Sequence, residues 1–219
     1  MSRRARLGRL VLPFLLALPL SAQALDEVRL AAVPALAVRH DGQTGVVHYI
    51  VIQINRRPQS DGPVVQFNEI ALGGGAAVGN DWKDGVKRAV RASLRYLDLE
   101  GTDWLVTIKN RSHNALTEGM SASSAVAVGV LAAWQGDTVR PNVALTGEIT
   151  LDGRILDVGQ VPQKVEAAAR EHFATVLIPR GQLRTPDWDL TQVASKLHVE
   201  VVEVGTLDEA YRLMTGTGR

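Results

Sequence analysis

The chain has 219 residues, of which 46% are hydrophobic, so it is long and apolar enough to form one mid-sized domain with a sizeable core. Its 24 basic and 23 acidic residues nearly cancel, to a net charge of +1. The absence of cysteine excludes disulfide bonds, thiol catalysis and cysteine-ligated metals.

The first 24 residues differ from the rest of the chain. Four of the first nine residues are arginines, and the short apolar run VLPFLLALPL follows. Ala22-Gln23-Ala24 then forms a small-x-small cleavage site. This is the pattern of a secretory signal peptide, and the apolar run is about half as long as a membrane span requires. We therefore expect a signal peptide over 1–24, cleaved near Ala24, and one periplasmic or secreted domain over 25–219. An uncleaved anchor is the alternative.

Cleavage would change the charge balance. It removes 4 of the 24 basic residues and no acidic one, which leaves 20 basic against 23 acidic residues and a net charge of −3. That balance disfavours nucleic-acid binding, which needs a basic stripe. The sequence has neither the H-E-x-x-H spacing of a zinc site nor a phosphate-binding loop, so we expect no metal, no ATP and no other cofactor.

The first predicted elements are strands. Residues 46–54 and 64–72 are rich in β-branched and apolar side chains, and the turn-forming segment RRPQSDG between them predicts a long hairpin. The glycines at 73–75 indicate a flexible turn. An apolar stripe at helical spacing predicts a helix over 81–97, and 103–108 is a short strand.

The second half alternates helices and strands. Residues 121–134 are small and apolar on all sides, which is typical of a buried helix. Asp152-Gly153 predicts a tight hairpin with a type I′ turn. Pro162 suits the first turn of a helix that ends near His172. The remaining elements are strands at 175–178 and 199–204 and a helix at 207–214. Together these predict one α+β domain.

Ser121 lies at the start of the buried helix, where it is either a helix cap or a nucleophile. Backbone N–H groups of this first turn, those of Ser121 and Ala122, would suit a developing oxyanion. Of the five histidines, none lies in a catalytic signature, and the nearest candidate base is His113.

Lys164 is the better candidate for the base, although a lysine on a helix is ordinarily solvated. It follows Pro162 in the first helical turn. Lysine is a base only when neutral, and lowering its pKa from about 10.4 to roughly 7–8 needs about 4 kcal/mol of bias against the charged form. Burial and a helix N-terminus both act in that direction.

These two regions resemble a known family. EGMSASSAVAVG is similar to the serine motif of the Lon protease proteolytic domain in its archaeal form. TGEITLDGRILDVGQVPQKVEAAAREHFATVLIPRG resembles the segment of that domain that carries the catalytic lysine. Ser121 and Lys164 are 43 residues apart (164 − 121), a separation similar to the family's, and close matching runs over 105–181. The resemblance implies a mixed sheet with flanking helices and β-hairpins.

The resemblance also implies roles for individual residues. Ser121 matches the nucleophile and Lys164 the general base. Thr146 matches a hydroxyl that hydrogen-bonds near the lysine, with a satisfied strand-end threonine as the alternative. Glu118 matches an acidic position, usually Asp, and its alternative is a favourable charge near a helix start. Glu148 belongs to the Thr-Gly-Glu motif and is expected to be structural.

The sequence departs from the family pattern at three positions. Gln160 stands where a second glycine usually precedes the lysine helix. Thr107 and Lys109 stand where many bacterial relatives have histidines. These differences leave the serine and lysine in place and put contacts at the rim of the site in doubt.

The implied activity is that of a serine endopeptidase. Lon enzymes join this domain to an ATPase that unfolds substrates, and this chain has no Walker motif. We therefore expect ATP-independent cleavage of flexible or unfolded polypeptides. The alternative is a non-catalytic binding or assembly module with the same fold. The resemblance also implies a possible homo-oligomeric ring.

Overall fold

The computed structural model describes residues 28–39, 41–57, 62–71, 77–99, 103–112 and 116–217. The predicted signal peptide, the glycines at 73–75 and His113 lie outside the described residues. The strands are β1 (Arg29–Val38), β2 (Gly45–Arg56), β3 (Val64–Ala71), β4 (Ala77–Val78), β5 (Trp104–Ser112), β6 (Leu116–Thr117), β7 (Val143–Leu145), β8 (Glu148–Ile149), β9 (Ile155–Leu156), β10 (Thr175–Pro179) and β11 (Glu200–Val204). The helices are α1 (Asn80–Tyr96), α2 (Ser123–Gln135), α3 (Val161–Arg170), α4 (Leu190–Leu197) and α5 (Leu207–Thr215).

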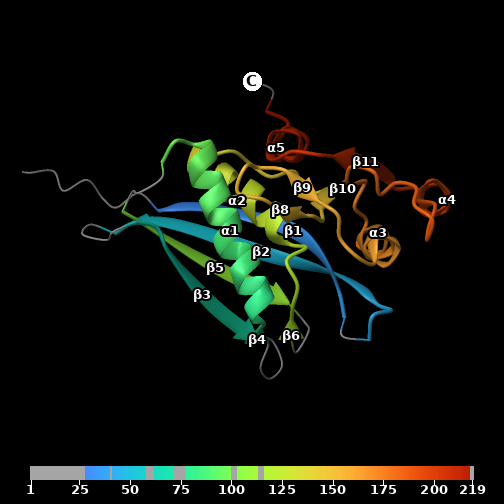
Figure 1. Cartoon of the computed structure of the whole chain (residues 1–219), viewed down its shortest axis with the longest axis horizontal. Helices are drawn as coiled ribbons and strands as arrows, with labels where there is room; N and C mark the ends of the chain where they lie inside the picture. The colour runs from blue at the N-terminus through green and yellow to red at the C-terminus, as the bar shows by residue number, and fades with distance from the viewer. Residues whose placement is uncertain are drawn as a thin grey trace, which may run out of the picture.

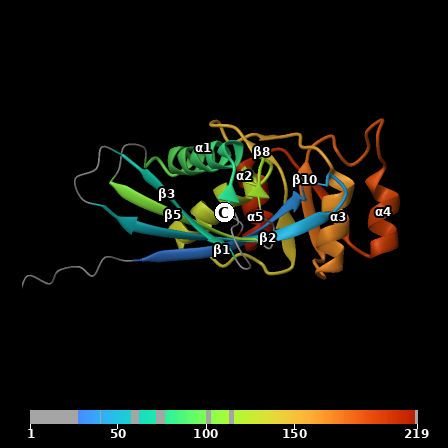
Figure 2. The same cartoon turned by 90° about the horizontal axis from the view of Figure 1, so that it is seen from below.

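Seven strands form one mixed sheet, in the order β11-β10-β7-β1-β2-β5-β3. β1, β7 and β10 run parallel to one another, whereas β2 is antiparallel to both of its neighbours. Helices α1 and α2 lie over the long strands, and α3 and α4 lie together at the other end of the sheet (Figures 1 and 2). The predicted mixed sheet with flanking helices is confirmed.

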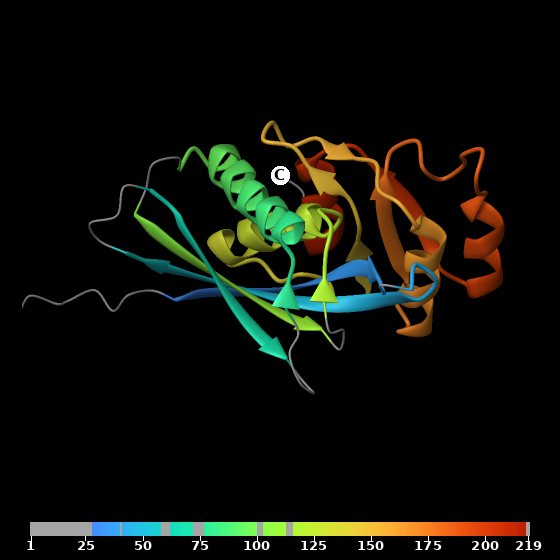
Figure 3. The same ribbon diagram turned by 60° about the horizontal axis from the view of Figure 1, so that its bottom comes forward.

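The core is divided between the two faces of the sheet. Leu177 of β10 packs in the cluster that contains α2, while its neighbours Val176 and Ile178 pack in the cluster that contains α3. Successive strand residues point to opposite faces, so α2 and α3 cover opposite faces of this part of the sheet. Figure 3 shows the first of these layers, with α1 and α2 over the long strands.

The predicted hairpin between 46–54 and 64–72 is wrong. Both strands exist, but β5 lies between β2 and β3, pairing antiparallel with β2 and parallel with β3. Turn-forming residues show that the chain leaves one strand, but they do not determine which strand becomes its neighbour. β2 buries Ile50, Ile52 and Ile54 and has a partner along each edge, namely β1 and β5. Sequence reasoning also missed β1 and α4.

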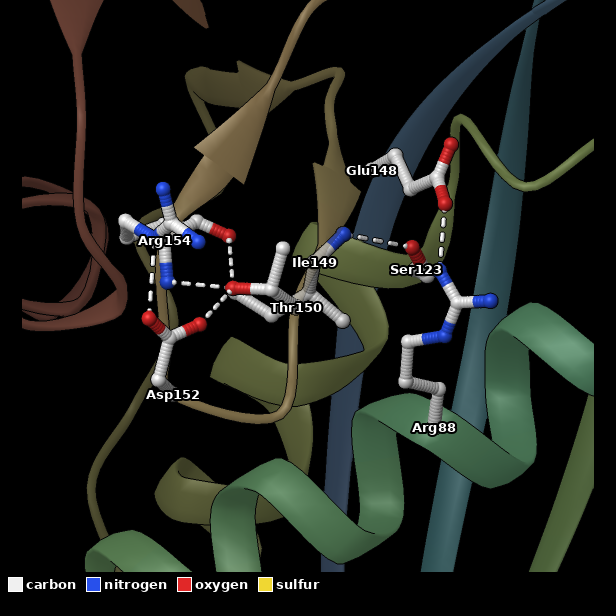
Figure 4. A network of polar contacts seen from close by, with 7 residues as sticks. All are labelled: Arg88, Ser123, Glu148, Ile149, Thr150, Asp152 and Arg154. Carbon is white, nitrogen blue, oxygen red and sulfur yellow. Dashed lines mark hydrogen bonds and ion pairs between the residues drawn. The ribbon is translucent and has the colours of Figure 1, made fainter.

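The predicted hairpin at Asp152-Gly153 is confirmed, but its type I′ turn is wrong. The loop has three residues, 151–153, and the Thr150 amide donates to the Arg154 carbonyl at 2.9 Å across its base. Type I′ needs positive φ at two central residues, whereas here only Gly153 has it, at 81°. Side-chain bonds that join Thr150, Asp152 and Arg154 hold this wider loop (Figure 4).

The predicted helix over 81–97 is confirmed by α1, and the buried helix over 121–134 by α2. Eleven residues of α2 are buried, on every side of the helix. A Cβ on Gly129 would lie 2.5 Å from Ile52 Cδ1, so α2 packs closely on the sheet at this glycine, and a larger residue would displace the Ile52 side chain. Within the described part of the chain, we find no helix with the length and apolarity of a bilayer span.

Candidate active site

Ser121 lies in the turn that leads into α2, two residues before the helix begins. Its carbonyl oxygen accepts a hydrogen bond from the Gly147 amide at 2.8 Å. The same oxygen accepts a second bond, at 3.3 Å, from the hydroxyl of Thr146, which is fully buried. Ser121 is therefore held from the strand side by Thr146 and Gly147. The hydroxyl expected to bond near the lysine contacts the carbonyl of the serine.

The backbone amides of this turn differ in whether they have a hydrogen-bond acceptor within the described part of the chain. Those of Ser123 and Ser124 donate to backbone carbonyls, at 2.9 and 3.1 Å. Those of Ser121 and Ala122 donate to no other residue in the described part of the chain. The two amides expected to face an oxyanion are therefore available to an external oxygen.

Lys164 lies in the first turn of α3, and its residue is only 3% exposed. Among the described residues, its ammonium group has no hydrogen bond and no ion pair. Burial lowers the pKa of this ammonium group from 10.5 to about 8, because the charged form loses its hydration without gaining a counter-ion. A substantial fraction of Lys164 is therefore neutral in mildly alkaline solution.

Ser121 and Lys164 line the same pocket, which has a volume of about 340 Å³. Its walls are residues 118–121 and 157–160, together with Glu148 and the end of β1 at 37–38. β1 and β7 are parallel, so their carboxyl ends meet at one edge of the sheet, and both helices begin there. In this way the serine and the lysine reach one pocket from helices on opposite faces.

Two carboxylates from the sequence prediction also line the pocket. Glu148 on β8 forms an ion pair with Arg88 of α1, which anchors the hairpin to that helix (Figure 4). Glu118 lies over the start of α1, where a Cβ built on Gly79 would be 2.8 Å from its Oε1. The positive end of a helix dipole favours a carboxylate at such a position. The helix concerned is α1, whose N-cap is Gly79.

Comparison with known proteins places these elements in one family. Residues 106–214 match the Lon protease (S16) C-terminal proteolytic domain. This part of the chain belongs to the Lon proteolytic domain family. The resemblance stated from the serine and lysine motifs is confirmed.

Individual relatives agree with this assignment. The Lon protease of Trichlorobacter lovleyi is 30% identical over 159 residues, which are 68% of this chain and 19% of that protein. The archaeal Lon protease of Methanocaldococcus jannaschii is 24% identical over 189 residues, or 86% of this chain and 28% of that protein. The chain thus spans less than a third of the length of these two Lon relatives.

Gln160 departs from the Lon pattern at a position with unusual backbone geometry. It precedes α3 with φ 58° and ψ 37°, in the left-handed region where glycine is favoured. Its side chain donates to the Gly42 carbonyl at 3.1 Å. Gln160 therefore adopts a backbone conformation that favours glycine, and its side-chain bond to Gly42 accompanies the strain.

Sequence reasoning missed two residues that shape this Lon pocket. Asp157 lines it directly. Gln182, which is only 6% exposed, binds the backbone of Val158 twice: its Oε1 accepts from the amide at 3.1 Å, and its Nε2 donates to the carbonyl at 2.8 Å. Gln182 thereby satisfies both backbone groups of Val158, as a neighbouring strand would, and holds this wall of the pocket. Asp157 directly follows β9 and Gln182 follows a turn, and no local sequence pattern distinguishes either residue.

Thr107 and Lys109, the other departures from the family pattern, lie on β5 away from the pocket. Lys109 donates to the Gln53 side chain of β2 at 3.3 Å. Thr107 is buried opposite Gln53 in the strand register. In this structure the two positions contribute to the sheet and not to the lining of the Lon pocket.

Proposed function

We propose that this chain is an exported, ATP-independent serine endopeptidase that cleaves flexible or unfolded polypeptides with Ser121 and Lys164. The observation that carries the proposal is the convergence of a serine and a buried lysine without a counter-ion in one pocket. The Lon relatives, which are named proteases, support the same class of reaction. The signal-like first 24 residues motivate export, and the missing phosphate-binding loop motivates ATP independence.

In the proposed reaction, neutral Lys164 removes the proton of Ser121 Oγ as this oxygen attacks the peptide carbonyl carbon. The Lys164 ammonium then gives the proton to the departing amine, and the C–N bond breaks to leave an acyl-enzyme. Water attacks the ester, Lys164 takes a proton from it, and Ser121 recovers a proton when the acid leaves.

Two features of the site fit this sequence of steps. The amides of Ser121 and Ala122 would donate to the oxyanion of each tetrahedral intermediate. Thr146 and Gly147 hold the Ser121 carbonyl from the strand side, which limits rotation of the turn that carries the nucleophile. Preorganisation of this kind lowers the cost of bringing Oγ to the scissile bond.

Digestion of casein, an unfolded polypeptide, tests the proposal. The purified chain should cleave it at the same rate with and without ATP and Mg²⁺, and Ser121→Ala should not cleave it. Ser195→Ala, which changes an exposed serine on α4, is the matched control and should keep full activity. Circular dichroism establishes that each variant is folded. A folded wild-type chain that binds casein without cutting it would identify the non-catalytic module instead.

A further inference from the structure

The charged groups of the active-site pocket are mostly acidic. Its lining contains three carboxylates, on Glu118, Glu148 and Asp157, and one amine, on Lys164. Glu148 is neutralised by Arg88. Glu118 and Asp157 form no ion pair within the described part of the chain. When Lys164 is neutral, as the proposed reaction requires, the pocket therefore presents two uncompensated negative charges.

The two free carboxylates stand on different walls. Glu118 begins the wall that ends at Ser121, and its side chain is placed by close approach to Gly79 at the start of α1. Asp157 belongs to the wall that leads to Lys164. It directly precedes Val158, whose amide and carbonyl are both bound by Gln182. Each carboxylate is thus attached to a backbone segment that the fold holds in place.

We propose that this pocket selects polypeptide segments with a lysine or arginine side chain beside the scissile bond, and that Glu118 and Asp157 recognise that cation. The inference rests on the proposed function and specifies its substrate class. A cationic side chain would be attracted to the carboxylates and an acidic one repelled. The acidic residues are not the sole sign of a binding site, because the buried, unpartnered Lys164 lines the same pocket.

A binding measurement separates this inference from turnover. Ser121→Ala holds the substrate uncut, and fluorescence anisotropy compares two labelled peptides that differ only by lysine or norleucine at one position. The lysine peptide should bind on the order of tenfold more tightly at low salt, as two partly exposed ion pairs allow. The preference should fade at about 1 M salt, where the Debye length falls to about 3 Å.

Variants then assign the preference to its residues. Adding Glu118→Gln or Asp157→Asn to the Ser121→Ala chain should each reduce the affinity ratio, and adding both should bring it close to one. Asp187→Asn, which changes an exposed carboxylate outside the pocket, is the matched control and should leave the ratio unchanged. The affinity for the norleucine peptide shows whether a variant has damaged the pocket itself.

The outcomes distinguish the two proposals. Equal affinity for the two peptides, or a preference that survives the double substitution, overturns the charge selection. Cleavage of both peptides by the wild-type chain without preference also overturns it, while supporting the peptidase. Selective binding by a wild-type chain that cuts neither peptide would overturn the peptidase and leave the recognition of cationic segments standing.

Discussion

Lys164 is almost fully buried, and this burial determines when its amine can act as a base. With its pKa lowered to about 8, activity should rise as pH increases through that value and then level off. Lys164→Arg should be inactive at every pH, because guanidinium stays protonated. Peptide cleavage measured against pH checks both, with Lys109→Arg, outside the pocket, as the control. A midpoint near 6.5 would point to a histidine base instead.

The same burial costs stability. Lowering the lysine pKa from 10.5 to about 8 corresponds to about 3 kcal/mol. The unfolded chain keeps this proton to a higher pH than the native chain, so the free energy of unfolding should rise between pH 8 and 10.5. The penalty is fully present below pH 8 and gone above 10.5.

Lys164→Met tests this cost, because it replaces the amine with an uncharged side chain of similar length. The variant should be inactive yet about 3 kcal/mol more stable than wild type at pH 7, and the difference should shrink as pH approaches 10.5. Urea unfolding at several pH values measures it. A difference that does not change with pH would show that packing, and not charge burial, separates the two proteins.

A substitution at Gln182 tests whether its two hydrogen bonds to Val158 stabilise the pocket wall. Gln182→Leu introduces an apolar side chain of similar size and leaves the amide and carbonyl of Val158 without their partner. Losing these part-buried contacts should cost about 1 kcal/mol of stability. Because Val158 lines the pocket, kcat/KM should fall as well. Unfolding and peptide-cleavage assays on the same preparation would detect both effects, and an unchanged Tm would contradict the first.

At the scale of elements, the β8–β9 hairpin is tied to two helices. The Ile149 amide donates to Ser123 Oγ on α2 at 2.9 Å, and Glu148 pairs with Arg88 on α1 (Figure 4). The first contact joins the hairpin to the start of α2, just after Ser121, and the second joins it to α1. The hairpin therefore fixes the start of α2 relative to the strand end that also holds the Ser121 carbonyl.

Adjacent serines of α2 should respond differently to alanine. Ser123→Ala leaves the buried Ile149 amide without an acceptor and should lower the free energy of unfolding by about 1–3 kcal/mol. Ser124→Ala removes a buried hydroxyl that has no hydrogen-bond partner among the described residues, so it should be neutral or slightly stabilising. Thermal unfolding of the two variants gives the comparison. Equal losses at the two positions would mean that the hairpin contact contributes nothing.

At the scale of the whole molecule, the site depends on two helices that cover opposite faces of one sheet and begin at the same edge. Neither helix alone supplies both reacting groups. Parallel pairing of β1, β7 and β10 brings their carboxyl ends together, and the serine turn and the start of the lysine helix lie at that edge. The pocket is thus a product of topology as much as of side chains.

Export is a property of the whole chain, and we predict it from the first 24 residues. The basic start, the apolar run and Ala22-Gln23-Ala24 predict a mature protein that begins at Leu25. Mass spectrometry of the periplasmic or secreted fraction should find this terminus. Ala24→Pro should block processing and leave a larger species, whereas Gln23→Asn should be processed normally. An intact Met1 terminus in the cytosolic fraction would refute export.

Sequence alone sufficed for features that depend on short-range order. Hydrophobic spacing identified α1, and a run of small apolar residues identified α2. Asp152-Gly153 located a hairpin, and the two motifs that carry Ser121 and Lys164 indicated the family. These signals are local, because a helical face, a turn and a motif are each written within a few consecutive residues.

Only the tertiary structure decided the rest. The insertion of β5 between β2 and β3 reflects competition among strands for edges, which no single segment encodes. The burial that lowers the pKa of Lys164 comes from residues brought around it by the fold. Asp157 lines one wall of the pocket, and Gln182 hydrogen-bonds to Val158 in the same wall, although Asp157 and Gln182 are 25 positions apart (182 − 157). Long-range packing alone makes such pairs neighbours, so local patterns cannot reveal them.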